Sequence, residues 1–220
     1  MSSPSPPLVE LEFARRYDQE HARVCCESRP AGIGMRLALW RMTHLVRHAL
    51  KVAGEPGLIL DVACGVGRYW PLLAEHGNRV ILAADPSLEM LTHAQTHHPD
   101  SLLKRVKTFH SSAFDIGLSA NAVDSIICMH LFAHVARSED RLALLREFYR
   151  VSRDSVIIAT RVASLFKVGL PVNADASALA LISKAQLEAE FKLADFEVLS
   201  HQDLLPGCAL SRVYVLRKQG

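Results

Sequence analysis

Two kinds of hydrophobic pattern alternate along this chain. Short apolar runs bounded by glycine, proline or charged residues are typical of buried strands, whereas apolar residues spaced three and four apart are typical of helices. The first pattern predicts strands at 58–63, 79–85, within 102–113, and at 123–130, 154–162, 196–204 and 211–218. The second predicts helices at 9–27, 34–52, 68–77, 86–98, 138–152 and 182–194.

The order of these elements predicts the fold class. Strands that alternate with helices form βαβ units, whose strands pair in parallel and whose helices cover both faces of the sheet. The last two strands follow each other without a helix between them. We therefore expect an α/β fold with a mainly parallel seven-stranded sheet, into which the last strand inserts antiparallel.

Two of the helices carry signals at their starts. Pro86 falls in the first turn of the helix at 86–98, where a proline is well tolerated because the N–H that it lacks would have no helical partner. Ser183 opens the helix at 182–194 and Gln186 follows three residues later, which is the pattern of a capping box.

The chain is predicted to form one structural domain with three successive segments. A chain of 220 residues suffices for one sizeable core. We expect a disordered Ser/Pro-rich leader at 1–8, a helical cap at 9–53 and the main domain at 54–220, with "GEPG" at 54–57 marking the boundary.

Composition and charge exclude several classes of protein. The net charge of +2 is too small to favour nucleic acid as a general partner. The chain has no apolar run of the roughly 18–20 residues that span a bilayer, and its amino terminus does not resemble a secretory signal. The five cysteines have no spacing typical of a disulfide framework or a metal site. We expect a cytoplasmic protein with reduced thiols, no membrane span and no metal.

A glycine-rich loop follows the first predicted strand. In a sheet of this kind ligands bind at the carboxyl ends of the strands, where Gly65 and Gly67 lie. Asp85 ends the second strand, 20 residues after Gly65, where a carboxylate can accept hydrogen bonds from ribose hydroxyls. The alternatives are a tight turn without a ligand and, for Asp85, a cap on the following helix.

Two residues in this loop argue against a dinucleotide. Asp61 would repel the pyrophosphate that such a loop must hold, and Trp70 stands where the third glycine of the dinucleotide fingerprint belongs. A ligand with an ammonium group and no phosphate would instead favour Asp61. S-adenosylmethionine has that chemistry and also carries a ribose.

Three stretches resemble the motifs of the class I S-adenosylmethionine-dependent methyltransferases. "LDVACGVGRY" at 60–69 is similar to the first motif, which reads acid-x-x-x-Gly-x-Gly, and "AADPSLEML" at 83–91 to the second. The stretch 111–135 is similar to the adenine-contacting loop and the fourth strand. The similarity runs from about residue 57 to 160 and resumes through 182–199. It implies a Rossmann-like methyltransferase fold, with S-adenosylmethionine as cofactor.

The resemblance implies a role for each matching position. Asp61 and the backbone from Ala63 to Gly67 would face the methionine part of the cofactor, and Asp85 would hold the ribose hydroxyls. Asp115 would meet the exocyclic amine of adenine, because Ser112 stands where the family has another acid. The full expected cofactor set is Asp61, Ala63, Cys64, Gly65, Gly67, Asp85, Pro86, Met90, Ala113, Phe114, Asp115 and Cys128. Met90 could equally be a core residue of its helix.

Two residues are candidates for catalysis. Methyl transfer is an in-line displacement, and a hydroxyl or ammonium acceptor also needs a general base. His130, directly after the fourth strand, is the candidate base, with a structural role in the chamber wall as the alternative. Tyr17 matches a Tyr-Asp pair that many small-molecule members of the family place over the cofactor. We interpret His134 as structural.

The apolar cap segments favour a small, partly hydrophobic acceptor. No Asn/Asp-Pro-Pro-aromatic motif follows the fourth strand, which argues against DNA as substrate. Two alternatives stay open: an RNA or protein methyltransferase that docks through the basic helix 36–51, and a non-catalytic S-adenosylmethionine-binding protein. The chain would be a monomer or a homodimer.

Overall fold

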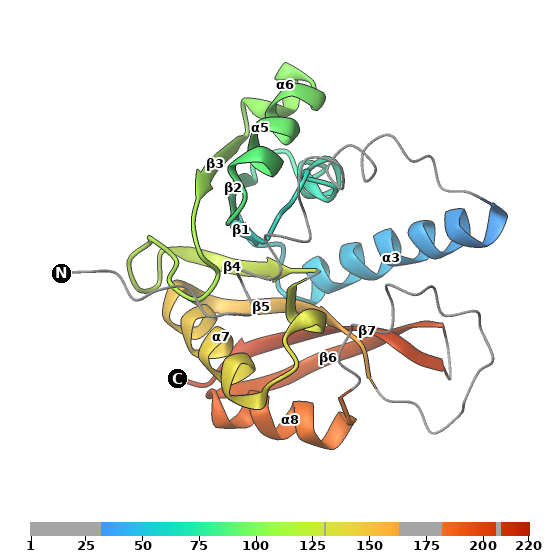
Figure 1. Cartoon of the computed structure of the whole chain (residues 1–220), viewed down its shortest axis with the longest axis vertical. Helices are drawn as coiled ribbons and strands as arrows, with labels where there is room; N and C mark the ends of the chain where they lie inside the picture. The colour runs from blue at the N-terminus through green and yellow to red at the C-terminus, as the bar shows by residue number, and fades with distance from the viewer. Residues whose placement is uncertain (1–31, 130, 163–181, 206–207) are drawn as a thin grey trace.

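The computed structural model describes residues 32–129, 131–162, 182–205 and 208–220. Within them one sheet has the strand order β3-β2-β1-β4-β5-β7-β6 (Figure 1). The strands are β1 (Leu58–Val62), β2 (Val80–Asp85), β3 (Val106–His110), β4 (Val123–Cys128), β5 (Ser152–Thr160), β6 (Phe196–Leu205) and β7 (Cys208–Lys218). The helices are α3 (Ile33–Val52), α4 (Trp70–Leu73), α5 (Leu88–His97), α6 (Asp100–Leu103), the 3-10 helix η1 (Leu131–His134), α7 (Ser138–Val151) and α8 (Lys184–Leu193).

The pairing confirms the predicted sheet. Strands β1 to β5 pair in parallel, and β7 lies between β5 and β6 and runs antiparallel to both. The final strand can insert in this way because a hairpin joins it to β6 without a crossover helix. The chain therefore has the expected Rossmann-like α/β fold, with an antiparallel last strand.

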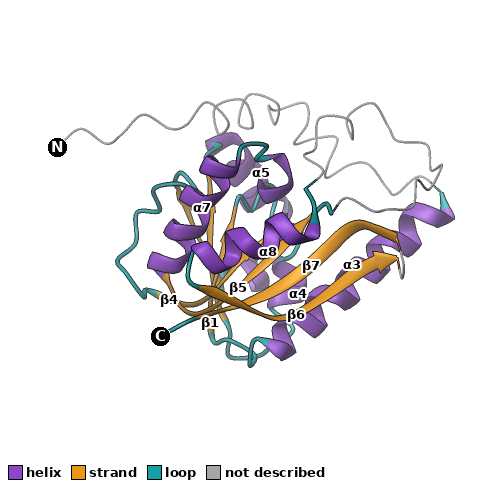
Figure 2. Cartoon of the chain, turned by 90° about the horizontal axis from the view of Figure 1, so that it is seen from below, coloured by secondary structure: helices purple, strands orange, loops and turns teal. Residues whose placement is uncertain are grey.

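Helices cover both faces of the sheet, and each face has its own core (Figure 2). Side chains of α7 and α8 pack with Leu60 and Ile126 on one face. Side chains of α3, α4 and α5 pack with Ile59 and Ile127 on the other. Neighbouring residues of a strand point to opposite faces, so a strand buried on both sides must be apolar throughout. That requirement explains the short unbroken apolar runs of the sequence.

Helix α3 confirms the predicted helix at 34–52. Its carboxyl-terminal half buries Leu45, Val46 and Ala49 in the second core, and the helix packs on β6 and β7. None of the described helices is both long and apolar enough to cross a membrane.

Three local predictions were wrong. The helix expected at 68–77 shortens to α4, since the chain is still turning through the glycine loop until Trp70. Pro86 lies before α5 and outside its first turn, because Ser87 is the N-cap and accepts a hydrogen bond from the N–H of Met90. Only half of the capping box forms at α8: Ser183 accepts from the N–H of Gln186, whose side chain instead bonds Glu190.

Candidate cofactor site

The carboxyl ends of β1 and β2 bring the first two predicted motifs together. The parallel register places Asp61 beside Ala83, and the N–H of Cys64 donates to the carbonyl of Ala84 at 3.1 Å. One residue further on, a carboxylate oxygen of Asp85 accepts the N–H of Gly65 at 2.7 Å. The second strand therefore fixes the shape of the glycine loop.

The glycine loop alternates left-handed residues. Ala63, Gly65 and Gly67 have φ values of 54°, 55° and 72°. A β-carbon added at Gly65 would meet nothing within 4 Å in the described part of the chain, whereas one added at Gly67 would lie 2.4 Å from the Trp70 ring. Gly65 thus leaves a cradle that a ligand can fill, and Gly67 leaves room for the indole.

Asp61 is a buried carboxylate, and one of its oxygens has no hydrogen-bond partner among the described residues. Its side chain is 3% exposed, and neither its Oδ2 nor the Nε1 of Trp70 has a hydrogen-bond partner of good geometry among the described residues. Burial raises the pKa of Asp61 to about 8; the nearby indole N–H of Trp70 opposes this rise, and the charge of Asp85 adds to it. A cation next to Asp61 would stabilise its charged form.

Trp70 and His98 brace the glycine loop from behind. The Trp70 indole is fully buried, and its ring centroid lies 5.1 Å from that of His98. The Nε2–H of His98 donates to the carbonyl of Val66 at 2.9 Å. We did not predict either role: the sequence marked Trp70 only as a missing glycine, and His98 lies 32 residues from its partner.

Asp85 shapes the loop and still offers acceptor capacity. One of its oxygens accepts from Gly65 and the other accepts the N–H of Ser87 at 2.9 Å. Each carboxylate oxygen has a second lone pair, so ribose hydroxyls can still bind. Pro86 is half-buried beside it, and Met90 is buried in α5.

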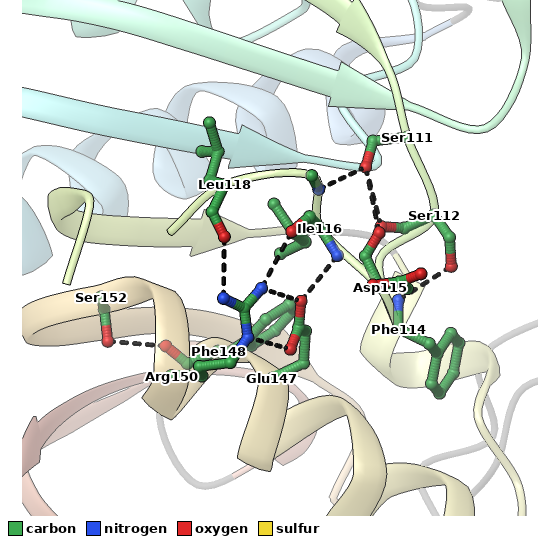
Figure 3. Close-up of polar contacts among 11 residues, drawn as sticks. Ser111, Ser112, Phe114, Asp115, Ile116, Leu118, Glu147, Phe148, Arg150 and Ser152 are labelled. Atoms are coloured by element: carbon green, nitrogen blue, oxygen red, sulfur yellow. Dashed lines mark hydrogen bonds and ion pairs between the residues drawn. The ribbon is translucent and has the colours of Figure 1, made fainter. Parts of the chain in front are cut away.

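The third predicted motif forms a loop after β3 (Figure 3). Ser111 Oγ accepts the N–H of Gly117 at 3.3 Å, and Ser112 Oγ accepts that of Phe114 at 3.0 Å. Ala113 is buried, Phe114 is half-buried and Asp115 is exposed. Asp115 is therefore accessible to a ligand.

The two described cysteines of the site are inert thiols. Cys64 and Cys128 are free and buried. Burial raises the pKa of Cys64 well above its usual value and that of Cys128 to about 12. Neither is a nucleophile at neutral pH, because the thiolate is the reactive form. The candidate catalytic residues, His130 and Tyr17, lie outside the described residues.

The comparisons agree with this geometry. Residues 60–160 match the family model of a methyltransferase domain. Residues 60–160 therefore form a methyltransferase domain, which is consistent with the class I S-adenosylmethionine-dependent methyltransferases. The resemblance stated for its motifs is confirmed, and its cofactor is S-adenosylmethionine. A comparison with curated protein sequences found no match.

Solved structures share the fold of this methyltransferase. Magnesium protoporphyrin IX methyltransferase from Synechocystis PCC 6803, with bound S-adenosylhomocysteine, is 16% identical, with a TM-score of 0.72 over 96% of this chain and 99% of that one. A methyltransferase from Aquifex aeolicus is 21% identical, with a TM-score of 0.67 over 92% and 99%. The [4+2]-cyclase SpnF is 15% identical, with a TM-score of 0.74 over 99% of both chains.

The residues around the glycine loop fit this cofactor. The open cradle at Gly65 gives backbone access, and the buried Asp61 can pair with an ammonium. Asp85 suits a ribose, and the loop at 113–115 lies next along the sheet edge. S-adenosylmethionine supplies an activated methyl group when bound, and the chain's own groups bind and orient it.

Proposed function

We propose that this chain transfers a methyl group from S-adenosylmethionine to a small, partly hydrophobic acceptor in the cytoplasm. The cofactor contacts follow the geometry above: Asp61 for the ammonium, Asp85 for the ribose and Asp115 for the adenine amine. The observation that carries the acceptor class is an exposed apolar stripe on α3, formed by Ile33, Leu37 and Trp40.

The stripe lies beyond the cofactor edge of the sheet. Leu45, in the middle of α3, shares a core cluster with Cys64 and Met129, which follow β1 and β4. The helix then continues towards its amino terminus, on the side to which the arrowhead of β4 points in Figure 1. Ile33, Leu37 and Trp40 are 85%, 60% and 56% exposed and fall on one helix face. Apolar surface of this kind favours an acceptor that buries carbon.

The basic residues of α3 favour this proposal over docking of RNA or protein. Arg47 forms two hydrogen bonds to Glu75, at 2.7 and 2.6 Å, and Arg41 donates to the carbonyl of Leu204. The Glu75 carboxylate neutralises Arg47, and the carbonyl of Leu204 engages Arg41, so both side chains are less available to phosphates.

An acceptor screen tests the proposal. S-adenosylhomocysteine release would be measured over paired acceptors that share the nucleophile and differ in apolar area. We expect Leu37→Asn to raise KM for the preferred acceptor roughly tenfold, since lost apolar contact is worth about 1–3 kcal/mol. Leu193→Asn is the matched control, because Leu193 is equally exposed, at 66%, but lies on α8. Turnover on RNA or protein alone would overturn the acceptor class.

The proposal for His130 as general base has its own kinetic test. His130→Ala should leave cofactor affinity unchanged while turnover falls by about 10²–10⁴-fold, and the rising limb of the pH profile should vanish. If His130→Asn keeps both the activity and the pH profile, His130 only shapes the chamber.

A further inference from the structure

An ion pair on α7 holds the backbone of the loop that follows β3. Glu147 Oε1 accepts the N–H of Ile116 at 2.6 Å, and Arg150 Nη2 donates to the carbonyl of the same residue at 2.9 Å. Arg150 Nη1 donates to the carbonyl of Leu118 at 2.7 Å (Figure 3). Side chains from a helix thus bind both polar backbone groups of Ile116.

The two side chains of this pair also fix each other. Arg150 Nε and Nη2 donate to the two carboxylate oxygens of Glu147 at 2.8 and 2.7 Å, across one turn of α7. This fork-to-fork geometry, with two parallel hydrogen bonds, fixes the relative orientation of the two side chains. Glu147 is 11% exposed and Arg150 is 39% exposed, so the Arg150 side faces solvent while the contact with Ile116 is shielded.

Helix α7 is itself firmly held. Its Arg141 makes a buried bidentate pair with Glu190 of α8, at 2.7 and 2.6 Å. Phe148 is fully buried and belongs to the same core cluster as Ile116. The clamp formed by Glu147 and Arg150 therefore rests on a rigid base.

The clamp and Ser111 both hold the carboxyl-terminal part of one short loop. Ser111 Oγ, at the start of the loop, accepts the N–H of Gly117 and donates to the carbonyl of Asp115. The clamp holds the next positions, Ile116 and Leu118. Phe114 and Asp115 lie directly before Ile116 in the loop that these bonds close, with Asp115 exposed.

We propose that Glu147 and Arg150 are positioning residues for the adenine of the cofactor. They touch no reacting atom; they fix the backbone that carries Phe114 and Asp115, and so set how well the exocyclic amine is recognised. This inference rests on the adenine contact that the proposed function gives to Asp115. It adds a determinant of cofactor selectivity outside the loop itself.

The test compares two ligands on one variant. S-inosylhomocysteine differs from S-adenosylhomocysteine only in the base, where a carbonyl replaces the exocyclic amine. Calorimetry on Arg150→Met should show the affinity for S-adenosylhomocysteine reduced roughly tenfold, the loss expected when a charged hydrogen bond is misplaced. The affinity for S-inosylhomocysteine should stay within about twofold of the wild-type value, since this ligand lacks the exocyclic amine from which Asp115 would accept a hydrogen bond.

Three further variants control this result. Arg153→Met also removes one arginine, from a pair with Asp124 at 2.8 Å that does not involve residues 111–118, and should leave both affinities unchanged. Glu147→Gln keeps an acceptor for Ile116 and should retain most of the selectivity. Arg150→Lys keeps the charge but lacks the fork, and should resemble Arg150→Met.

The possible outcomes distinguish the positioning role of the clamp from the proposed contact between Asp115 and the amine. An equal loss for both ligands would mean that the clamp is only structural, and no loss for either would mean that it does not position the loop; both overturn the inference. Wild-type protein that binds the two ligands equally would instead refute the contact between Asp115 and the amine. Asp115→Asn separates that failure, because it tests the contact with the clamp intact.

Discussion

The glycine loop at 61–70 and the loop at 111–118, which we propose to contact adenine and call the adenine loop, sit at one sheet edge but are stabilised in opposite ways. The glycine loop bends through residues of positive φ and contains a buried carboxylate with one oxygen that has no partner among the described residues. The adenine loop contains no positive φ, and an ion pair from α7 holds its backbone. The first is strained and buries a polar atom without a hydrogen bond, whereas the backbone of the second is held by side chains of the chain itself.

The two loops differ in whether the same residue affects ligand binding and protein stability in opposite directions. In the glycine loop, burying Asp61 destabilises the free protein, and the same group is the proposed partner of the cofactor's ammonium. In the adenine loop the backbone groups of Ile116 are bound by Glu147 and Arg150 without a ligand, so we expect substitutions there to act mainly on selectivity.

The largest effects are expected from substitutions at the two glycines of the glycine loop, which should differ in kind. Gly65→Val should abolish binding of S-adenosylhomocysteine, because the side chain fills the open cradle, and should destabilise the fold by about 1–2 kcal/mol through its positive φ. Gly67→Val should unfold much of the protein, since its β-carbon would meet the Trp70 ring. Thermal melts and calorimetry measure both. If Gly65→Val binds S-adenosylhomocysteine normally, the loop is only a strand-to-helix turn and does not bind the cofactor.

Asp61→Asn should weaken binding and strengthen the fold at once. Losing the ammonium's partner should reduce affinity roughly 30- to 1,000-fold, or about 2–4 kcal/mol. The free protein should gain about 1–4 kcal/mol of unfolding free energy at pH 8, because the raised pKa of Asp61 lowers stability progressively as pH rises from its unfolded value to about 8. Urea melts at pH 5 and pH 8 should diverge accordingly. If Asp61→Asn lowered both the affinity for S-adenosylhomocysteine and the free energy of unfolding, this prediction would be wrong.

The pH dependence of S-adenosylhomocysteine binding tests the contribution of Asp61 in the glycine loop. Affinity for S-adenosylhomocysteine should fall by about tenfold per pH unit below 8, because Asp61, with its pKa of about 8, must lose its proton to meet the ammonium. Cys64, Tyr69 and Asp85 also face this carboxyl; burial raises the pKa of Cys64 and of Tyr69, so both stay neutral over this range. 5′-Methylthioadenosine lacks the amino-acid end, and its affinity should not follow this slope.

The smallest effect concerns Ala63. Its φ of 54° strains a residue with a β-carbon, so Ala63→Gly should stabilise the protein by about 0.5–1 kcal/mol without changing cofactor affinity. Glycine at buried Ala113, which lies in the other loop, should instead destabilise. Paired thermal melts of the two variants would show whether, of these two loops, only the glycine loop is strained.

The fold could be predicted from the sequence, and so could the meeting of Asp61, Gly65 and Asp85 at the strand ends, but the residues that brace this loop could not. Apolar runs determine which strands are buried, and the missing last helix determines the antiparallel insertion of β7. Asp61, Gly65 and Asp85 were predictable because strand ends are local features of the chain. His98 and Arg150 were not, because each acts on a loop about thirty residues away, a proximity that only helix packing creates.

The two tryptophans give this enzyme a separate optical reporter for each half of its site. Trp70 is fully buried behind the glycine loop, and Trp40 is 56% exposed on α3, in the stripe that we propose to contact the acceptor. A buried indole emits at shorter wavelength than a hydrated one, so the two contributions to the emission spectrum can be resolved. Cofactor loading should change the blue component and acceptor loading the red one. The order in which the two ligands bind then becomes readable in a stopped-flow trace, without any label.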